Sequence, residues 1–251
     1  MRDRITVLFL ASDPFRDRAA PRLDEEVRAI DRAIGRGVPR GRVELVAHLA
    51  TRPRDLQDAL LRHDPQIVHF AGHGDDDGVL YLGDEHGRPR PVGKEALGNL
   101  FGTLSEWIEV VIVNGCDTLP TVEVLGAVVD YAIGMNRPLG DAAAILFAEA
   151  FYGALAMGHT VQRSFALGVS RMELDGNAES ATPVLRIRPG VDPALPLVAR
   201  PADGAGERAI NLGELHGEDV LLEKRPGREK RKTKVTRIRY ASGRGFVFRN
   251  R

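Results

Sequence analysis

Hydrophobic positions along the chain fall into two patterns that alternate. Some segments are continuous apolar runs, which are typical of strands buried in a parallel sheet. Others carry an apolar residue every three or four positions, which is typical of helices packed on such a sheet. From the apolar runs we expect strands at residues 5–11, 43–47, 67–71, 108–114, 131–135 and 184–187.

The spaced segments predict helices at residues 23–34, 53–62, 94–101, 122–130, 141–157 and 161–174. Residues 79–82 and 88–92 flank a Gly- and Asp-rich turn, which predicts a β-hairpin. Strands that alternate with helices indicate an α/β fold. We therefore expect a three-layer sandwich, in which a mostly parallel central sheet carries helices on both faces.

The C-terminal part of the chain has a different composition. Residues 196–206 are rich in Pro, Gly and Ala, which is typical of a linker. Residues 207–251 hold 13 Lys or Arg against 6 Asp or Glu, although the whole chain has a net charge of zero. We expect one domain over residues 1–200, followed over residues 201–251 by a linker and a small, basic, β-rich tail or hairpin.

Charge and apolar content also bear on partners and location. A net charge of zero gives no overall field that draws the protein to nucleic acid or to a membrane. The N-terminus lacks the features of a signal peptide, and no apolar run reaches the roughly 18 residues of a membrane span. The single cysteine, Cys116, excludes an intramolecular disulfide. We expect a cytoplasmic protein with a reduced thiol and no membrane partner.

The candidate catalytic residues follow the third and fourth expected strands. His73 lies just after the run at 67–71, and Cys116 lies just after the run at 108–114. In open parallel sheets, functional residues gather beyond the carboxyl ends of the strands. If these two strands are neighbours, the two side chains project from adjacent loops and form a Cys/His pair.

Such a pair has a defined chemistry. An imidazole can take the proton of a thiol, which becomes a strong nucleophile, and can later protonate a leaving amine. Gly74 permits close approach of a substrate, and the N–H groups of Gly74 and Cys116 are candidate donors to an oxyanion. The simpler alternatives are that Cys116 is a small core residue and that His73 is a surface residue.

Here the sequence resembles a known family. A strand followed by Gly-His-Gly at 72–74, and 43 residues after His73 a strand followed by Asn-Gly-Cys at 114–116, resemble the bacterial CHAT domains. Further similar segments are LFLASDP at 8–14, RLDEE at 22–26, GMN at 134–136 and PVLRIRPG at 183–190. The resemblance covers roughly residues 4–198. It implies a caspase- and separase-like cysteine peptidase fold.

The resemblance also implies roles for residues. His73 would be the general base, Cys116 the nucleophile, and Gly74 with Cys116 the oxyanion donors. Many relatives carry Asn-Ala-Cys where this chain has Gly115, a departure that should be tolerated. Family members often act in antiviral defence or signalling systems, so we expect a protein substrate and an activating sensor protein or protease as partners.

Two acids near the expected cleft suggest which type of substrate residue precedes the cut bond. Asp13 follows the first strand and Asp117 follows the thiol. We hypothesise that they form an acidic, substrate-binding pocket for an Arg or Lys side chain. The alternative is that Asp13 caps a turn and Asp117 caps the next helix.

Other chemistries have little support in the sequence. The remaining histidines show no ligand-like spacing, the Asp75-Asp76-Asp77 run is interpreted as a solvated turn, and no phosphate-binding loop is present. We therefore expect no metal and no cofactor. Residues 224–239, with nine Lys or Arg and one acid, are interpreted as a solvated tail, with nucleic-acid binding or self-cleavage as alternatives. A CHAT-like interaction module without turnover is the alternative to an enzyme.

Overall fold

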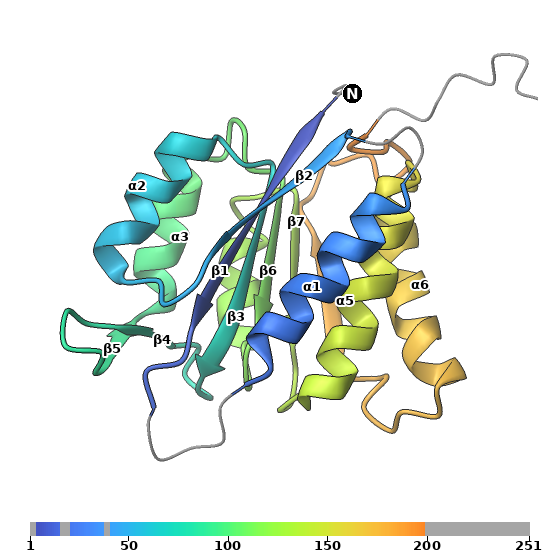
Figure 1. Cartoon of the computed structure of the whole chain (residues 1–251). Coiled ribbons are helices and arrows are strands. Elements are labelled where there is room, and N and C mark those ends of the chain that lie inside the picture. Colours follow the sequence, from blue (N-terminus) through green and yellow to red (C-terminus); the bar gives the residue numbers. More distant parts are fainter. Residues whose placement is uncertain (1–3, 16–20, 38–40, 199–251) are drawn as a thin grey trace, which may run out of the picture. The chain divides into compact units, whose positions relative to one another are not determined.

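A computed structural model of the chain describes residues 4–15, 21–37 and 41–198. Within these residues, six strands form a central sheet in the order β2-β1-β3-β6-β7-β8 (Figure 1). The first five are mutually parallel, and β8 runs antiparallel to β7. The predicted mostly parallel sheet is confirmed. The strands are β1 (Ile5–Ser12), β2 (Val43–His48), β3 (Ile67–Gly74), β6 (Val110–Asn114), β7 (Tyr131–Met135) and β8 (Pro183–Ile187).

The predicted hairpin is also confirmed. It consists of β4 (Leu80–Gly83) and β5 (Pro89–Val92), which pair antiparallel. The end of β3 continues beyond the central sheet and pairs with β4, where His73 lies opposite Tyr81 and Gly74 opposite Leu80. The hairpin therefore anchors the last two residues of β3.

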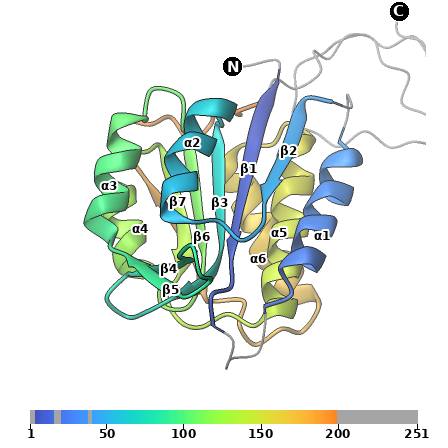
Figure 2. The ribbon, with the colours of Figure 1, turned by 60° about the vertical axis from the view of Figure 1, so that its left-hand side comes forward.

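Helices cover both faces of the sheet, as the alternating pattern predicts (Figure 2). Apolar side chains of α1 (Leu23–Gly35), α5 (Asp141–Ala156) and α6 (Val161–Leu174) form a core with one face. Those of α2 (Pro53–His63), α3 (Lys94–Thr103) and α4 (Leu119–Leu125) form a second core with the other face. The inner strands β1, β3, β6 and β7 are buried on both sides, which explains why their sequences are continuous apolar runs.

The prediction of a helix at 122–130 is wrong in its bounds. The helix α4 is shorter and earlier, from Leu119 to Leu125, with Pro120 in its first turn, where a missing N–H costs nothing. The apolar residues at 122, 125 and 129 are all buried, yet the last belongs to turns after the helix. Burial spacing alone therefore could not show where the helix ends. At Gly126 a Cβ atom would lie 2.9 Å from the Cβ of Arg186, so a glycine suits this close approach.

The described residues contain no helix with the length and apolar character needed to cross a membrane. The predicted linker and basic tail at 201–251 lie outside the described residues.

Candidate active site

The strands that carry the predicted Cys/His pair are neighbours. β3 and β6 run parallel in a register that places Ala71 beside Asn114. His73 and Cys116 each follow this register position by two residues, so both leave the same edge of the sheet. The condition on which the sequence prediction depended is therefore met.

Glycines bring the two strand ends into close contact. A Cβ atom on Gly74 would lie 2.7 Å from the carbonyl oxygen of Cys116. A Cβ atom on Gly115 would lie 3.4 Å from the backbone nitrogen of Gly74. A side chain at position 74 would therefore collide with the loop after β6, whereas the contacts at position 115 leave nearly enough room for a methyl group. The backbone N–H groups of Gly74 and Cys116, the predicted oxyanion donors, thus belong to loops that touch.

The imidazole of His73 is held in place by two contacts from the end of β1. Its Nε2 atom lies 2.9 Å from the Oδ1 atom of Asp13, with 12% and 23% of the two side chains exposed. The ring of Phe15 packs edge-on against it, with the ring centroids 4.9 Å apart. Asp13 accepting a hydrogen bond from Nε2 leaves Nδ1 as the proton acceptor of a neutral imidazole.

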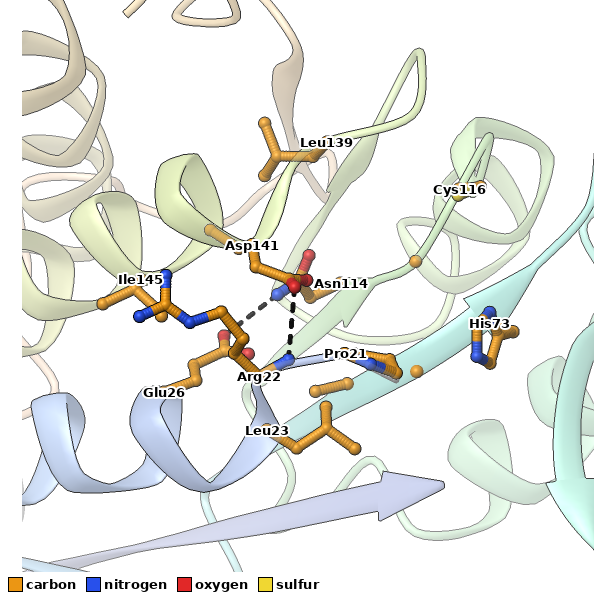
Figure 3. A pocket seen from close by; sticks show the side chains of 14 residues that line it. Pro21, Arg22, Leu23, Glu26, His73, Asn114, Cys116, Leu139, Asp141 and Ile145 are labelled. Carbon is orange, nitrogen blue, oxygen red and sulfur yellow. Dashed lines mark hydrogen bonds between the residues drawn. The ribbon is translucent and has the colours of Figure 1, made fainter. Parts of the chain in front are cut away.

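A pocket lies beside the pair (Figure 3). It has a volume of about 130 Å³, and both His73 and Cys116 line it. This is well below the roughly 300–1,000 Å³ typical of small-molecule sites, so the pocket fits one side chain rather than a large cofactor. The other described lining residues come from the starts of α1 and α5 and the strand ends: Pro21, Arg22, Leu23, Glu26, Ala71, Gly72, Asn114, Gly115, Leu139, Asp141, Ala144 and Ile145.

A buried polar network supports the floor of this pocket. Asn114 donates a hydrogen bond of 2.9 Å through Nδ2 to Oε1 of Glu26, whose side chain is 5% exposed. The same Oε1 atom lies 3.3 Å from Nε2 of buried His69, whose Nδ1 atom is 3.1 Å from the hydroxyl of Tyr152. Burial, and to a smaller extent the charge of Glu26, raises the pKa of Tyr152 well above its ordinary value.

Asp117 lies outside the described lining of the pocket. Its backbone has a φ of 50°, a left-handed conformation that is uncommon for residues other than glycine. Loss of solvent, and then the negative charge of Asp76, raises the pKa of the Asp117 carboxyl. The helix α4 begins after Thr118, and no side-chain hydrogen bond caps it. A substrate-binding role for Asp13 and Asp117 stays a prediction, although Asp13 also contacts His73 directly.

Sequence reasoning missed several residues of this region. Phe15, Glu26, Asn114 and Asp141 were not candidates, because an aromatic side chain, an acid in a first helical turn and an amide at a strand end are common outside active sites. Their shared signal is only their position next to the strand ends.

No group of three or more His, Cys, Asp or Glu that could hold a metal ion occurs within residues 4–15, 21–37 and 41–198.

Comparisons with known proteins place the chain in a family. The CHAT domain profile matches residues 4–181, which confirms the similarity suggested by the sequence motifs. A search of curated proteins gave no match. Among solved structures, caspase-1 from Spodoptera frugiperda is similar, with 10% sequence identity and a TM-score of 0.49. That match covers 73% of this chain and 86% of the caspase chain.

Proposed function

Because the chain belongs to the CHAT domain family, we propose that it is a cysteine endopeptidase in which Cys116 is the nucleophile and His73 the general base. The observation that carries this proposal is the pocket that both side chains line at one edge of the sheet. A thiol, an imidazole and a carboxylate at the ends of three neighbouring strands are the parts required for acyl transfer through a thioester.

The proposed reaction begins with His73. Asp13 accepts a hydrogen bond from Nε2, so Nδ1 takes the proton from the Cys116 thiol. The thiolate attacks the peptide carbonyl carbon, and the carbonyl electron pair moves onto the oxygen. The protonated imidazole then gives its proton to the amide nitrogen, the C–N bond breaks, and a thioester remains on Cys116. Water, deprotonated by His73, hydrolyses the thioester and restores the thiol.

The oxyanion formed in both steps needs hydrogen-bond donors. We assign the backbone N–H groups of Gly74 and Cys116 to this role, which the contact between their loops supports. The φ of 50° at Asp117 supports it further, since strained backbone often fixes the direction of a catalytic loop.

The biological setting remains part of the proposal. We propose a protein substrate, a peptidase domain at residues 1–200, and an activating partner that is a sensor protein or a protease. We propose a role in bacterial defence or signalling from the same family resemblance. A cytoplasmic location is proposed on separate grounds, because a single free cysteine suits a reducing compartment. The basic segment at 201–251 is proposed as a separate appendage.

The reactivity of the thiol provides a direct test. Because Cys116 is the only cysteine, any mass gained from iodoacetamide under native conditions at short times reports on it alone. We expect alkylation of the wild type to proceed at a pH below the ordinary thiol pKa of about 8.5. His73→Ala should move the profile back toward that value, whereas the control His86→Ala, in an exposed turn, should leave it unchanged.

Cleavage is then measured on a denatured-protein mixture and a peptide library. Cys116→Ala and His73→Ala should each remove cleavage, because general acid–base catalysis contributes roughly 10²–10⁴-fold and the nucleophile is essential. Full activity in either variant would overturn the proposed mechanism. A thiol with ordinary reactivity, together with no cleavage in the presence of candidate partners, would favour an interaction module.

A further inference from the structure

Glu26 is an acid in an unusual place. It lies in the first turn of α1, its side chain is 5% exposed, and it lines the pocket beside Cys116 (Figure 3). Both described polar contacts of the Glu26 carboxylate, from Asn114 and from His69, are made at its Oε1 atom. The His69 contact is also poorly aligned, because Nε2 makes no hydrogen bond. A carboxylate can accept hydrogen bonds at both oxygens, so Glu26 is suited to a ligand in the pocket that donates hydrogen bonds.

The charges around the pocket favour a cation. Asp141, at the start of α5, is a second lining acid, and its Oδ2 atom accepts a hydrogen bond of 3.3 Å from the backbone nitrogen of Arg22. The guanidinium of Arg22, the one Lys or Arg side chain among the described lining residues, pairs with Glu25 instead. Two acids therefore line the pocket, while the guanidinium of Arg22 pairs with Glu25 and also interacts electrostatically with Asp141.

The apolar part of the lining fits the same kind of ligand. Leu23, Leu139, Ala144 and Ile145 also line the pocket. A lysine or arginine side chain has an apolar stem and a charged end, so it can place the stem on such walls and the charge on an acid. The volume of about 130 Å³ suits one side chain of this kind.

We propose that this pocket receives the side chain of the substrate residue that precedes the cut bond, and that Glu26 selects lysine or arginine there. The proposal rests on the proposed peptidase function and assigns the specificity to Glu26, with Asp141 at the rim. In this proposal Glu26 and Asp141, rather than Asp13 and Asp117, contact the positive charge of the substrate. Asp13 instead positions His73 by its hydrogen bond to Nε2.

Two other roles for these residues predict different behaviour. If Glu26 only holds Asn114 in place, its charge is unimportant, because a glutamine at 26 can still accept the Asn114 hydrogen bond. If Arg22 turns from Glu25 into the pocket, the site selects an acidic side chain. Both alternatives can be separated by varying the charge of the ligand and of residue 26 independently.

The test uses the full-length chain and peptidyl chloromethyl ketones that differ only in the residue next to the reactive group. Arginine is compared with citrulline, its uncharged counterpart of similar shape, and with aspartate and leucine. The alkylation rate is followed by the intact mass, which reports on Cys116 alone. In the wild type we expect arginine to react roughly 10- to 100-fold faster than citrulline, the usual gain from hydrogen bonds between charged groups.

Glu26→Gln should reduce the arginine-to-citrulline ratio to about 3-fold or less, since charge-assisted hydrogen bonds are roughly twice as strong as neutral ones. The control Asp31→Asn removes an acid from the exposed side of the same helix and should preserve the ratio. Thermal unfolding of each variant checks that it folds. Asp141→Asn, at the pocket rim, should reduce the ratio by a smaller factor and provides a second variant if Glu26→Gln does not fold.

The outcomes separate the two proposals. Fast labelling by all four reagents without preference for arginine would overturn the specificity proposal and leave the thiol peptidase intact. Faster reaction with aspartate would overturn it in favour of Arg22. An unchanged ratio in a folded Glu26→Gln variant would show that Glu26 is only a structural residue. No labelling by any reagent, together with no cleavage, would overturn the peptidase function and the specificity with it.

Discussion

The Nε2 atom of His73 lies 2.9 Å from the Oδ1 atom of Asp13, so the end of β1 holds the imidazole that the end of β3 provides. The register of the two strands brings this about, since Ser12 is paired with Gly72 and the next residues along the chain are Asp13 and His73. We therefore predict that Asp13 is a positioning residue that acts through His73.

Replacing Asp13 by asparagine should impair the proposed base. An amide can donate a hydrogen bond to Nε2, which favours the tautomer whose Nδ1 carries the proton and cannot accept one. We expect kcat to fall by roughly 10- to 1,000-fold, within the range of general-base catalysis, with KM little changed. The pH profile of Cys116 alkylation should move toward that of His73→Ala. An Asp13→Asn variant with the wild-type profile would contradict this role.

Two glycine substitutions form a matched pair. In Gly74→Ala the new Cβ would lie 2.7 Å from the carbonyl oxygen of Cys116, so the loop that carries the thiol must move. A shift of about 1 Å can cost up to roughly 100-fold in rate, and we expect a loss of that order in kcat/KM. In Gly115→Ala the nearest contact is 3.3 Å, to Cγ2 of Thr118, and we expect a loss of about 3-fold or less. Equal losses of kcat/KM in the two variants would show that the contact between Gly74 and the loop after β6 does not determine the rate.

The left-handed backbone at Asp117 predicts which substitutions are tolerated at this position. Asparagine is tolerated in this conformation, and it also removes the repulsion between Asp117 and Asp76, so Asp117→Asn should unfold at an equal or higher urea concentration at pH 7. Asp117→Val forces a β-branched side chain into the same conformation and should cost about 1–2 kcal/mol. Equal stability of the two variants would show that the strain is relieved elsewhere.

His63 gives a prediction for the dependence of stability on pH. Burial, and then the neighbouring His48, whose Nε2 lies 3.3 Å from Nε2 of His63, lowers the pKa of His63 below its ordinary value of 6.5. Below pH 6.5 the unfolded chain therefore binds more protons than the folded one, and stability decreases as the pH falls.

The melting temperature should accordingly drop between pH 7.5 and 5.5, and His63→Gln should make this drop smaller. His86→Gln, which changes an exposed histidine in the β4–β5 turn, serves as the control and should leave the drop unchanged. A drop that is as large in His63→Gln as in the wild type would assign the pH dependence to other groups.

The positions of His73 and Cys116 could be predicted because they depend on features visible locally. An apolar run shows where a buried strand ends, and parallel strands end at a common edge of the sheet. The adjacency of β3 and β6 could only be assumed, since strand order depends on packing between segments far apart in the chain.

The contacts of Asp13 with His73 and of Glu26 with Asn114 could not be predicted, because they too depend on packing between distant segments. Asp13 meets His73 only because β1 and β3 are paired in one register, and a different register would place it elsewhere. Glu26 belongs to an acid-rich first turn, a pattern that already has an explanation in the helix dipole. Only the packing of α1 against the sheet shows that Glu26, unlike its exposed neighbour Asp24, is buried beside Asn114.

The placement of Asp13, His73 and Cys116 at the ends of three different strands has a consequence for the timing of biosynthesis. Asp13 and His73 are 60 residues apart, and Cys116 lies a further 43 residues along the chain. Contacts between such distant segments require the closure of long loops and form slowly. A nascent chain on the ribosome therefore keeps these three side chains apart until β6 has emerged and docked beside β3. Under the proposed function, a half-made polypeptide would lack the assembled site, because the connectivity of the sheet delays its formation.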